Sequence, residues 1–489
     1  MSVPVGSPGG AGGTNAAPAE PFSPALRRAV GVVMIGASLS FLDTTIVNVA
    51  VHTLLADFHA GLDTVQWVVT AYLLALAAVI PATGWAARRF GAARLYVAAL
   101  AVFTVASVLC ACSQNVGMLI ASRALQGIGG GAIMPVGTMI WTARSSKAQI
   151  GRVMGLIAIP IILAPTLGPA IGGLLIEGMD WRAIFWLNVP FGVAGVVLAL
   201  RLLPMDKGGE AGGLDVAGLI LASAGIVGVT YGLTELGTAA GPDTAAVIGL
   251  VAGGSALAGF VAHALRARRP LLDLRLYGSQ GFTAASIATF ALGAANYGGM
   301  ILMPLYFQTV RGESVVVAGL LLAPTGLGAL LAAPFTDRWG AGITAFSGAA
   351  VLAVSTVPFV FLSATTSYVL LCLVMVVRGI GFGLSIIPVM TAAYRTVPPD
   401  KIPDATPQLN VLQRVGGAIG TAALTVVLTH QLRHHSTPGE QADGFGTAFL
   451  WVLAITIAAA LPAVLLAWTE TRARRRPDAP KLRKAADVQ

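Results

Sequence analysis

The chain breaks into about fourteen apolar stretches, each close to the ~20 residues that a helix needs to cross a bilayer. Their long continuous apolar runs exclude a membrane β-barrel, whose strands alternate apolar and polar residues over ~10 positions. A chain in lipid must satisfy its own backbone hydrogen bonds, so we predict an all-α integral membrane protein. The predicted spans are 29–51, 64–86, 92–113, 116–141, 149–176, 182–203, 214–236, 244–265, 282–309, 315–335, 342–364, 367–394, 408–432 and 445–468.

The 30 Lys and Arg residues are unevenly distributed between the two sides of these spans. Twenty-four lie in the two tails and in the even-numbered gaps, and three lie in odd-numbered gaps. The remaining three lie in or at the edge of apolar stretches: Arg123, Arg378 and Arg414. Because loops rich in Lys and Arg stay on the cytoplasmic side, we predict fourteen crossings with both termini in the cytoplasm.

The composition argues against several other classes of protein. Charged residues make up 10% of the chain, against about 25% in soluble domains. The net charge of +9 lies in short loops beside apolar spans, so membrane topology and anionic lipid account for it without nucleic acid. The three cysteines have no nearby His or carboxylate, so no metal site is predicted. No phosphate loop or hydrolase motif is present, so we expect no cofactor, and uphill transport would need an ion gradient.

Two features recur in the same order along the chain, which indicates an internal repeat. The segment GWAARRFGAARL (84–95) resembles PFTDRWGAG (334–342), with Arg88 and Asp337 at equivalent places 249 positions apart. Arg123 and Arg378 are each followed by glycine-rich sequence and lie 255 positions apart. We therefore predict two six-helix copies with two helices inserted between them, a 6 + 2 + 6 arrangement. The predicted divisions are a cytoplasmic tail 1–24, a first bundle 25–205, the inserted helices 206–270, a second bundle 271–470 and a basic tail 471–489.

Several motifs resemble those of the major facilitator superfamily, in particular its fourteen-span drug:proton antiporter branch. They are LDTTIVNVA (42–50), QWVVTAYLL (66–74), GPAIGG (168–173) and WRAIFWLNVPFG (181–192). The resemblance covers about residues 25–470. It implies a major facilitator fold that exchanges small-molecule substrates for protons in the cell membrane, and a protein that we expect to be a monomer.

Three departures from the family pattern stand out. Arg88 replaces the family's Asp in the loop after the second span, where that Asp helps to latch the two halves together. Val51 and His52 stand where the family usually has a small residue and Pro, and Ala164 replaces the first glycine of the antiporter motif. The resemblance also implies cytoplasmic gating loops, which here comprise Gly84, Arg88, Arg89, Gly91, Asp337, Arg338 and Gly340.

Asp43 is the carboxylate that lies deepest in an apolar stretch. Placing a charge at mid-membrane costs at least ~2.5–3.5 kcal/mol, so such a residue is a functional candidate. A group that titrates while the protein opens to one side and then the other can couple transport to protons. The alternative is a permanent ion pair that only fixes two helices.

Arg123 is the natural partner of Asp43, since an arginine this deep must face the interior and pair with something. The resemblance places the first and fourth spans side by side, and we predict that Arg123 and Asp43 form the proton-coupling site. The alternative for Arg123 is a structural anchor. For Arg378 we expect a structural role, and for Arg414 a position at the cytoplasmic surface.

Other residues are assigned to a hinge and to a substrate cavity. Prolines bend a helix and glycines allow close helix contacts, so the fifth span is predicted to govern rocking of the two halves. Its antiporter-motif residues are Gly155, Pro165, Gly168, Pro169, Gly172 and Gly173. Polar and aromatic residues within the spans are candidates for a largely apolar cavity: Asn48, Trp67, Tyr72, Gln126, Asn188, Asn296, Tyr297 and Gln308.

The predicted function is proton-driven export of hydrophobic or amphipathic compounds such as drugs or antibiotics. One alternative keeps the fold and exports an endogenous metabolite, a siderophore or a lipid precursor, or takes up a solute in symport. Another alternative is a membrane enzyme or a channel. No paired acids, metal cluster or repeated filter sequence supports it.

Overall fold

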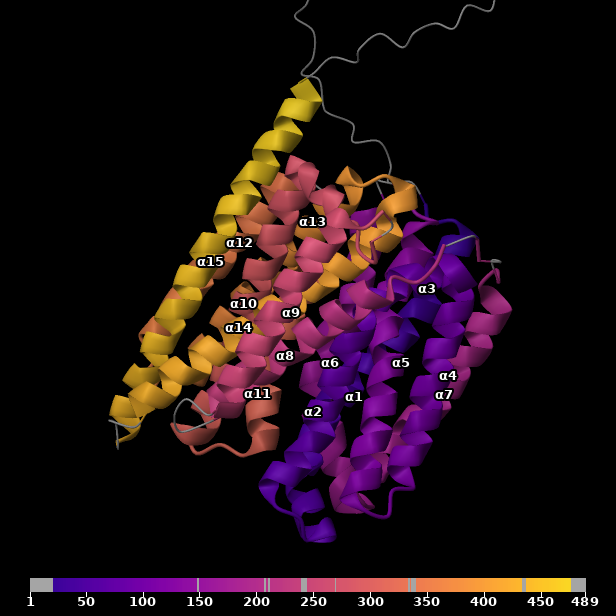
Figure 1. Ribbon diagram of the computed structural model, residues 1–489. Coiled ribbons are helices and arrows are strands. Elements are labelled where there is room, and N and C mark those ends of the chain that lie inside the picture. Colours follow the sequence, from indigo (N-terminus) through magenta and orange to yellow (C-terminus); the bar gives the residue numbers. More distant parts are fainter. Residues whose placement is uncertain are drawn as a thin grey trace, which may run out of the picture.

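The computed structural model describes residues 21–146, 149–205, 208–209, 212–238, 244–268, 270–332, 335, 340–432 and 437–475. Every regular element in these residues is a helix (Figure 1). Twelve stretches are long and apolar enough to cross a membrane, and α11 adds a shorter apolar stretch, Val317–Ala332.

The N-terminal bundle, indigo to magenta in Figure 1, comprises the first six predicted spans. Its second span is divided by a 3-10 turn at Ile80–Ala82, which contains Pro81. Two of its helices begin at side-chain caps, because Ser23 and Asn115 accept hydrogen bonds from the backbone N–H groups of Leu26 and Met118. The helices are α1 (Pro24–Phe58), α2 (Leu62–Val79), α3 (Thr83–Phe90), α4 (Ala92–Ala111), α5 (Val116–Thr142), α6 (Ile150–Gly178) and α7 (Ala183–Leu202).

The rest of the described chain forms a helix pair and a second bundle. The pair is α8 (Val216–Thr238) and α9 (Thr244–Arg266), and a short 3-10 helix at Leu274–Gly278 follows it. The C-terminal bundle comprises α10 (Gln280–Thr309), α11 (Val315–Ala332), α12 (Ala341–Val360), α13 (Tyr368–Thr396), α14 (Ile402–Leu432) and α15 (Pro438–Arg475).

The same helix pairings occur in both bundles. In the first, α4 packs against α5 and α7, α2 against α5, and α1 against α7. In the second, α12 packs against α13 and α15, α11 against α13, and α10 against α15. Gly91 and Gly340 precede α4 and α12 with φ of 89° and 94°, a backbone conformation that favours glycine. This packing supports a repeat, but α5 and α13 are related by an offset of 252 positions, so Arg378 corresponds to Gln126 and not to Arg123 as the sequence indicated.

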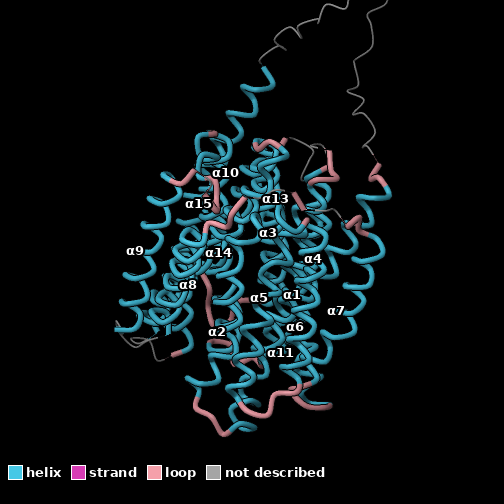
Figure 2. Tube along the Cα trace, turned by 45° about the vertical axis from the view of Figure 1, so that its right-hand side comes forward, coloured by secondary structure: helices cyan, strands magenta, loops and turns pink. Residues whose placement is uncertain are grey.

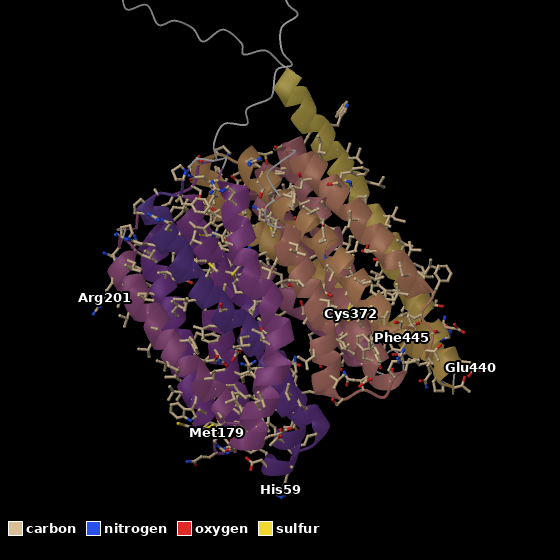
Figure 3. The ribbon with its side chains drawn as sticks, turned by 180° about the vertical axis from the view of Figure 1, so that it is seen from behind. His59, Met179, Arg201, Cys372, Glu440 and Phe445 are labelled. Atoms are coloured by element: carbon tan, nitrogen blue, oxygen red, sulfur yellow. The ribbon has the colours of Figure 1, made fainter. Side chains whose placement is uncertain are left out.

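The helices run from one end of the molecule to the other. His59, which follows α1, and Met179, which follows α6, lie at the same end of the N-terminal bundle in Figure 3. Glu440, near the start of α15, lies at the corresponding end of the C-terminal bundle. Loops therefore alternate between the two ends, as the spacing of apolar stretches predicts.

The two bundles meet along α6 on one side and α14 on the other. Helix α6 contacts α11 and α13, and α14 contacts α3, α5 and α8. Helix α8 also contacts α2, so it lies across the boundary between the bundles, with α9 on its outer side (Figure 2). Gly228 and Gly232 of α8 meet Gly253 and Gly249 of α9, which lets the two backbones approach closely.

Candidate functional site

Asp43 is fully buried on α1 and is surrounded by donors from two other helices. Its Oδ2 lies 2.6 Å from Arg123 Nη1 on α5. Its Oδ1 accepts hydrogen bonds from Gln126 Nε2 of α5 at 2.9 Å and from Asn188 Nδ2 of α7 at 2.8 Å. One charged and two neutral donors thus converge on this carboxylate.

Arg123 is held on several sides besides Asp43. Its Nε donates to the Val68 carbonyl at 3.1 Å and its Nη1 to Gln126 Oε1 at 2.6 Å. The guanidinium lies 4.1 Å from the centroid of the Tyr72 ring, within cation–π range. The arginine therefore keeps partners on α2 and α5 when its contact with Asp43 changes.

Gln126 connects the two charged residues to α4. Its Nε2 donates to Ser107 Oγ at 2.7 Å as well as to Asp43. Because Gln126 lies three residues after Arg123, both side chains share one face of α5. Two of the three donors to Asp43, Arg123 and Gln126, therefore each have further partners.

The energetics of this network depend on charge balance. A buried ion pair with one partner removed leaves an uncompensated charge, which typically costs 3–5 kcal/mol. Adding a proton to Asp43 has the same consequence for Arg123, because the carboxyl group then carries no charge. A proton at Asp43 thus favours any arrangement that gives Arg123 a different partner or access to water.

The structure places Arg123 against Asp43, as the sequence indicated. Asn188 was expected only as a possible cavity residue, and its direct contact with Asp43 was not foreseen. Ser107 was missed entirely. The available signal for Asn188 was an amide inside the apolar part of the WRAIFWLNVPFG segment.

The residues assigned to a substrate cavity do not all lie together. Tyr72 and Gln126 are buried within the Asp43 network. Trp67 stacks on Tyr231 of α8, with ring centroids 6.0 Å apart. Asn48 and Asn296 each donate to a carbonyl of their own helix. Tyr297 is exposed and Gln308 is half-buried, both on α10.

Helix α6 packs closely against α1 beside Asp43. A Cβ at Gly168 would lie 2.1 Å from Thr45 Oγ1, and one at Gly172 would lie 2.9 Å from Cγ1 of Ile46. Thr45 Oγ1 donates to the Ala164 carbonyl at 3.1 Å. Gly155, Pro165, Pro169 and Gly173 also belong to α6, which continues as a helix through both prolines.

Replacing Gly168 by valine is expected to reduce transport strongly and to lower thermal stability. The added side chain would collide with Thr45, and overpacking of this kind costs about 1–3 kcal/mol. The matched control is Gly178→Ala at the end of the same helix, where an added Cβ meets nothing within 4 Å. Equal transport rates and melting temperatures for the two variants would contradict the close α1–α6 contact.

Arg88 connects the two bundles at the end of the molecule opposite His59. It forms an ion pair with Asp404 near the start of α14, 316 positions away in the sequence. Gly84 allows this approach, since a Cβ there would lie 2.3 Å from the Pro403 carbonyl oxygen. The family's acid is absent from this loop, but an acid on the other bundle faces the arginine that replaces it.

A second ion pair lies at this end of the C-terminal bundle. Lys401 Nζ lies 2.9 Å from Asp273 Oδ2. Partial burial tends to raise the pKa of Asp273, but hydrogen bonds from Lys401 and the Arg275 backbone outweigh it and hold that pKa below its usual range. Arg89 is exposed, and Asp337 and Arg338 lie outside the described residues.

Comparison with known proteins identifies relatives over most of the chain. A family model described as the Major Facilitator Superfamily matches residues 33–421. The Multidrug resistance protein B homolog of Mycobacterium tuberculosis is 36% identical over 419 residues, covering 84% of this chain and 77% of that protein. The Methylenomycin A resistance protein of Bacillus subtilis is 33% identical over 407 residues, covering 81% of this chain and 86% of that protein.

A solved structure also resembles this chain. The human organic anion transporter MFSD10 (TETRAN) matches with a TM-score of 0.62, over 90% of this chain and 99% of that one. Its sequence identity is 15%, so the likeness concerns the fold alone.

Proposed function

Because the chain belongs to the major facilitator superfamily, and so is a multi-pass membrane transporter rather than an enzyme, we propose that it exports hydrophobic or amphipathic compounds in exchange for protons. The observation that carries this proposal is Asp43, a carboxylate without solvent exposure whose ion-pair partner Arg123 has further partners. Drug and antibiotic export is favoured over metabolite export because the relatives are named for multidrug and methylenomycin A resistance.

The proposed topology has fourteen spans with both termini in the cytoplasm. Besides the twelve stretches already described, α6 and α11 cross the membrane as the fifth and tenth spans, which gives 6 + 2 + 6. The distribution of Lys and Arg supports this orientation. In this topology the Arg88–Asp404 pair closes the cytoplasmic side between the bundles.

The proposed coupling begins with the charge of Asp43. When Asp43 takes a proton, its contact with Arg123 weakens, and α1 can shift relative to α5. Helix α1 is joined to α6 through Thr45 and Ala164, and α6 contacts α11 and α13 of the other bundle. The proton thereby favours one facing state over the other, as a population shift requires.

A vesicle experiment tests the exchange directly. Inside-out membrane vesicles containing the protein are prepared with an interior more acidic than the medium. Uptake of a panel of lipophilic dyes and antibiotics is then measured. We expect at least one compound to accumulate, and a protonophore to abolish that accumulation. Accumulation that survives the protonophore, or that follows another ion gradient, would rule out proton exchange.

Replacing Asn188 by alanine is expected to slow gradient-driven transport by about tenfold. The variant removes a neutral donor from the charged carboxylate, and a hydrogen bond to a charged group contributes about 1.5–3 kcal/mol. The ion pair between Asp43 and Arg123 is then held less firmly, and the facing state that it stabilises is less populated.

The matched control is Asn410→Ala, which removes an amide that donates within its own helix, to the Thr406 carbonyl. Transport by the Asn188 variant at the unmodified rate, or an equal loss in the Asn410 variant, would contradict a role for the hydrogen bond from Asn188 to Asp43.

A further inference from the structure

The C-terminal bundle contains a buried arginine that the Asp43 network does not use. Arg378 lies midway along α13 with 7% of its surface exposed. Its Nη1 donates to Thr356 Oγ1 at 2.6 Å, and its guanidinium lies 5.9 Å from the centroid of the Phe359 ring. A guanidinium has five N–H donors, so this single side-chain acceptor leaves most of them without a strong partner.

Arg378 occupies the place in the second bundle that Gln126 occupies in the first. Gly379 and Gly381 of α13 pack on α11 and α12 as Gly127 and Gly129 of α5 pack on α2 and α4, an offset of 252 positions that also separates Arg378 from Gln126. Thr356 lies 249 positions after Ser107, the same offset that separates the equivalent Gly340 and Gly91. Both hydroxyl residues lie at the same point of α4 and α12, facing the arginine networks. The two bundles therefore present a hydroxyl group and a side-chain donor in the same arrangement, and the donor is a neutral amide in the first bundle and a guanidinium in the second.

The acid of the first bundle has no counterpart in the second. The helix next to Arg378 contributes Gly299, where a Cβ would lie 2.4 Å from Nη2. Three residues before Arg378, Met375 stands at the place that Arg123 has in the first bundle. Among the residues that the structure describes, α10, α11, α12 and α13 contain no Asp or Glu, and no ion pair to Arg378 is present. This guanidinium is buried without a counter-ion from the described chain.

Arginine stays charged at any physiological pH, and an unpaired buried charge is costly. A mobile anion would supply the missing negative charge. We propose that Arg378 and Thr356 bind a monovalent anion, which is either chloride or the carboxylate of a transported compound. The second source depends on the proposed export function, whereas the first does not. The site would give the carrier a preference for acidic or neutral compounds over cationic ones.

The test is anion binding by the purified full-length protein in detergent, without any proton gradient. Thermal unfolding is followed while sodium chloride is added in one arm. In a second arm sodium benzoate is compared with its uncharged methyl ester. A ligand that binds only the folded protein raises the melting temperature, and we expect a rise of about 3 °C near saturation. The chloride and benzoate arms distinguish the two sources of the anion.

Arg378→Gln is expected to lose this rise, and Arg378→Lys to keep part of it. Gly299→Asp is also expected to lose it, because a carboxylate on α10 would pair with the guanidinium internally. The matched control is Arg414→Gln, which removes a partly buried arginine of α14 and should respond like the unmodified protein. If Arg378→Gln does not fold, Gly299→Asp carries the comparison.

A response to either anion that both variants lose supports the site. The proposal is overturned if neither anion stabilises the unmodified protein more than the methyl ester does, or if Arg378→Gln or Gly299→Asp responds fully. No proton gradient is present in this assay, so its result neither supports nor contradicts the proposed proton exchange.

Discussion

The Asp43→Asn substitution is expected to abolish proton-driven accumulation of substrate in inside-out vesicles, with a loss of at least about 100-fold. The amide keeps nearly the same shape but carries no charge and binds no proton between pH 5 and 9. Accumulation needs a group that exchanges a proton between facing states with different affinity. Counterflow, in which labelled substrate exchanges for unlabelled substrate without a gradient, should persist, because it needs no net proton movement.

The Asp43→Asn variant leaves Arg123 as a buried, unpaired charge, which is expected to lower stability by about 3–5 kcal/mol. The double variant Asp43→Asn with Arg123→Gln removes both charges and should recover much of that stability. It should still fail to accumulate substrate. Gradient-driven accumulation by either variant at the unmodified rate would exclude Asp43 as the proton carrier.

The Arg88→Asp substitution is expected to separate the two bundles at the end of the molecule that carries Arg88, the cytoplasmic end in the proposed topology. Arg88→Asp places a second carboxylate beside Asp404 in place of the ion pair. Arg88 is 31% exposed, so solvent screens the pair, and its loss is worth only about 1 kcal/mol. Repulsion between two carboxylates adds to this, and we expect the ratio of closed to open molecules to fall by about tenfold.

The measurement is the distance between spin labels at positions 90 and 396, at the exposed ends of α3 and α13. The native cysteines at 110, 112 and 372 are first replaced. The distance distribution should shift to longer values in Arg88→Asp and return in the swapped variant Arg88→Asp with Asp404→Arg.

Lys401→Gln is the matched control for this pair. It breaks an ion pair with Asp273 that lies on one side of the boundary, so the distances should not change. If the swapped variant stays as open as Arg88→Asp, the attraction between these two side chains does not hold this end of the two bundles together.

The sequence predicted the helices well because the cost of exposing backbone to lipid leaves few alternatives. Hydropathy marks only the apolar part of a helix. It placed the start of one span at 408, whereas α14 begins at Ile402 and carries Asp404 in its first turn. The polar first turn of α14 is therefore the part that apolar patterning misses.

The pairing of Asp43 with Arg123 was predictable for a similar reason. A charge in the membrane interior needs a partner, and few candidates exist. Contacts between neutral or surface groups carry no such constraint. The contact of Asn188 with Asp43, and that of Arg88 with Asp404, depend on the placement of helices 145 and 316 positions apart. Neither distance in space follows from spacing along the chain.

The most direct test of proton exchange at Asp43 is proton release on substrate binding. The purified protein is placed in weakly buffered detergent solution near the midpoint of its pH profile. A compound identified in the vesicle experiment is then added, and the protons released are counted with a pH indicator. Linkage between substrate and proton predicts release of at most about half a proton per molecule from the unmodified protein at this pH, and none from Asp43→Asn. Equal release from both proteins would contradict the assignment of the exchanged proton to Asp43.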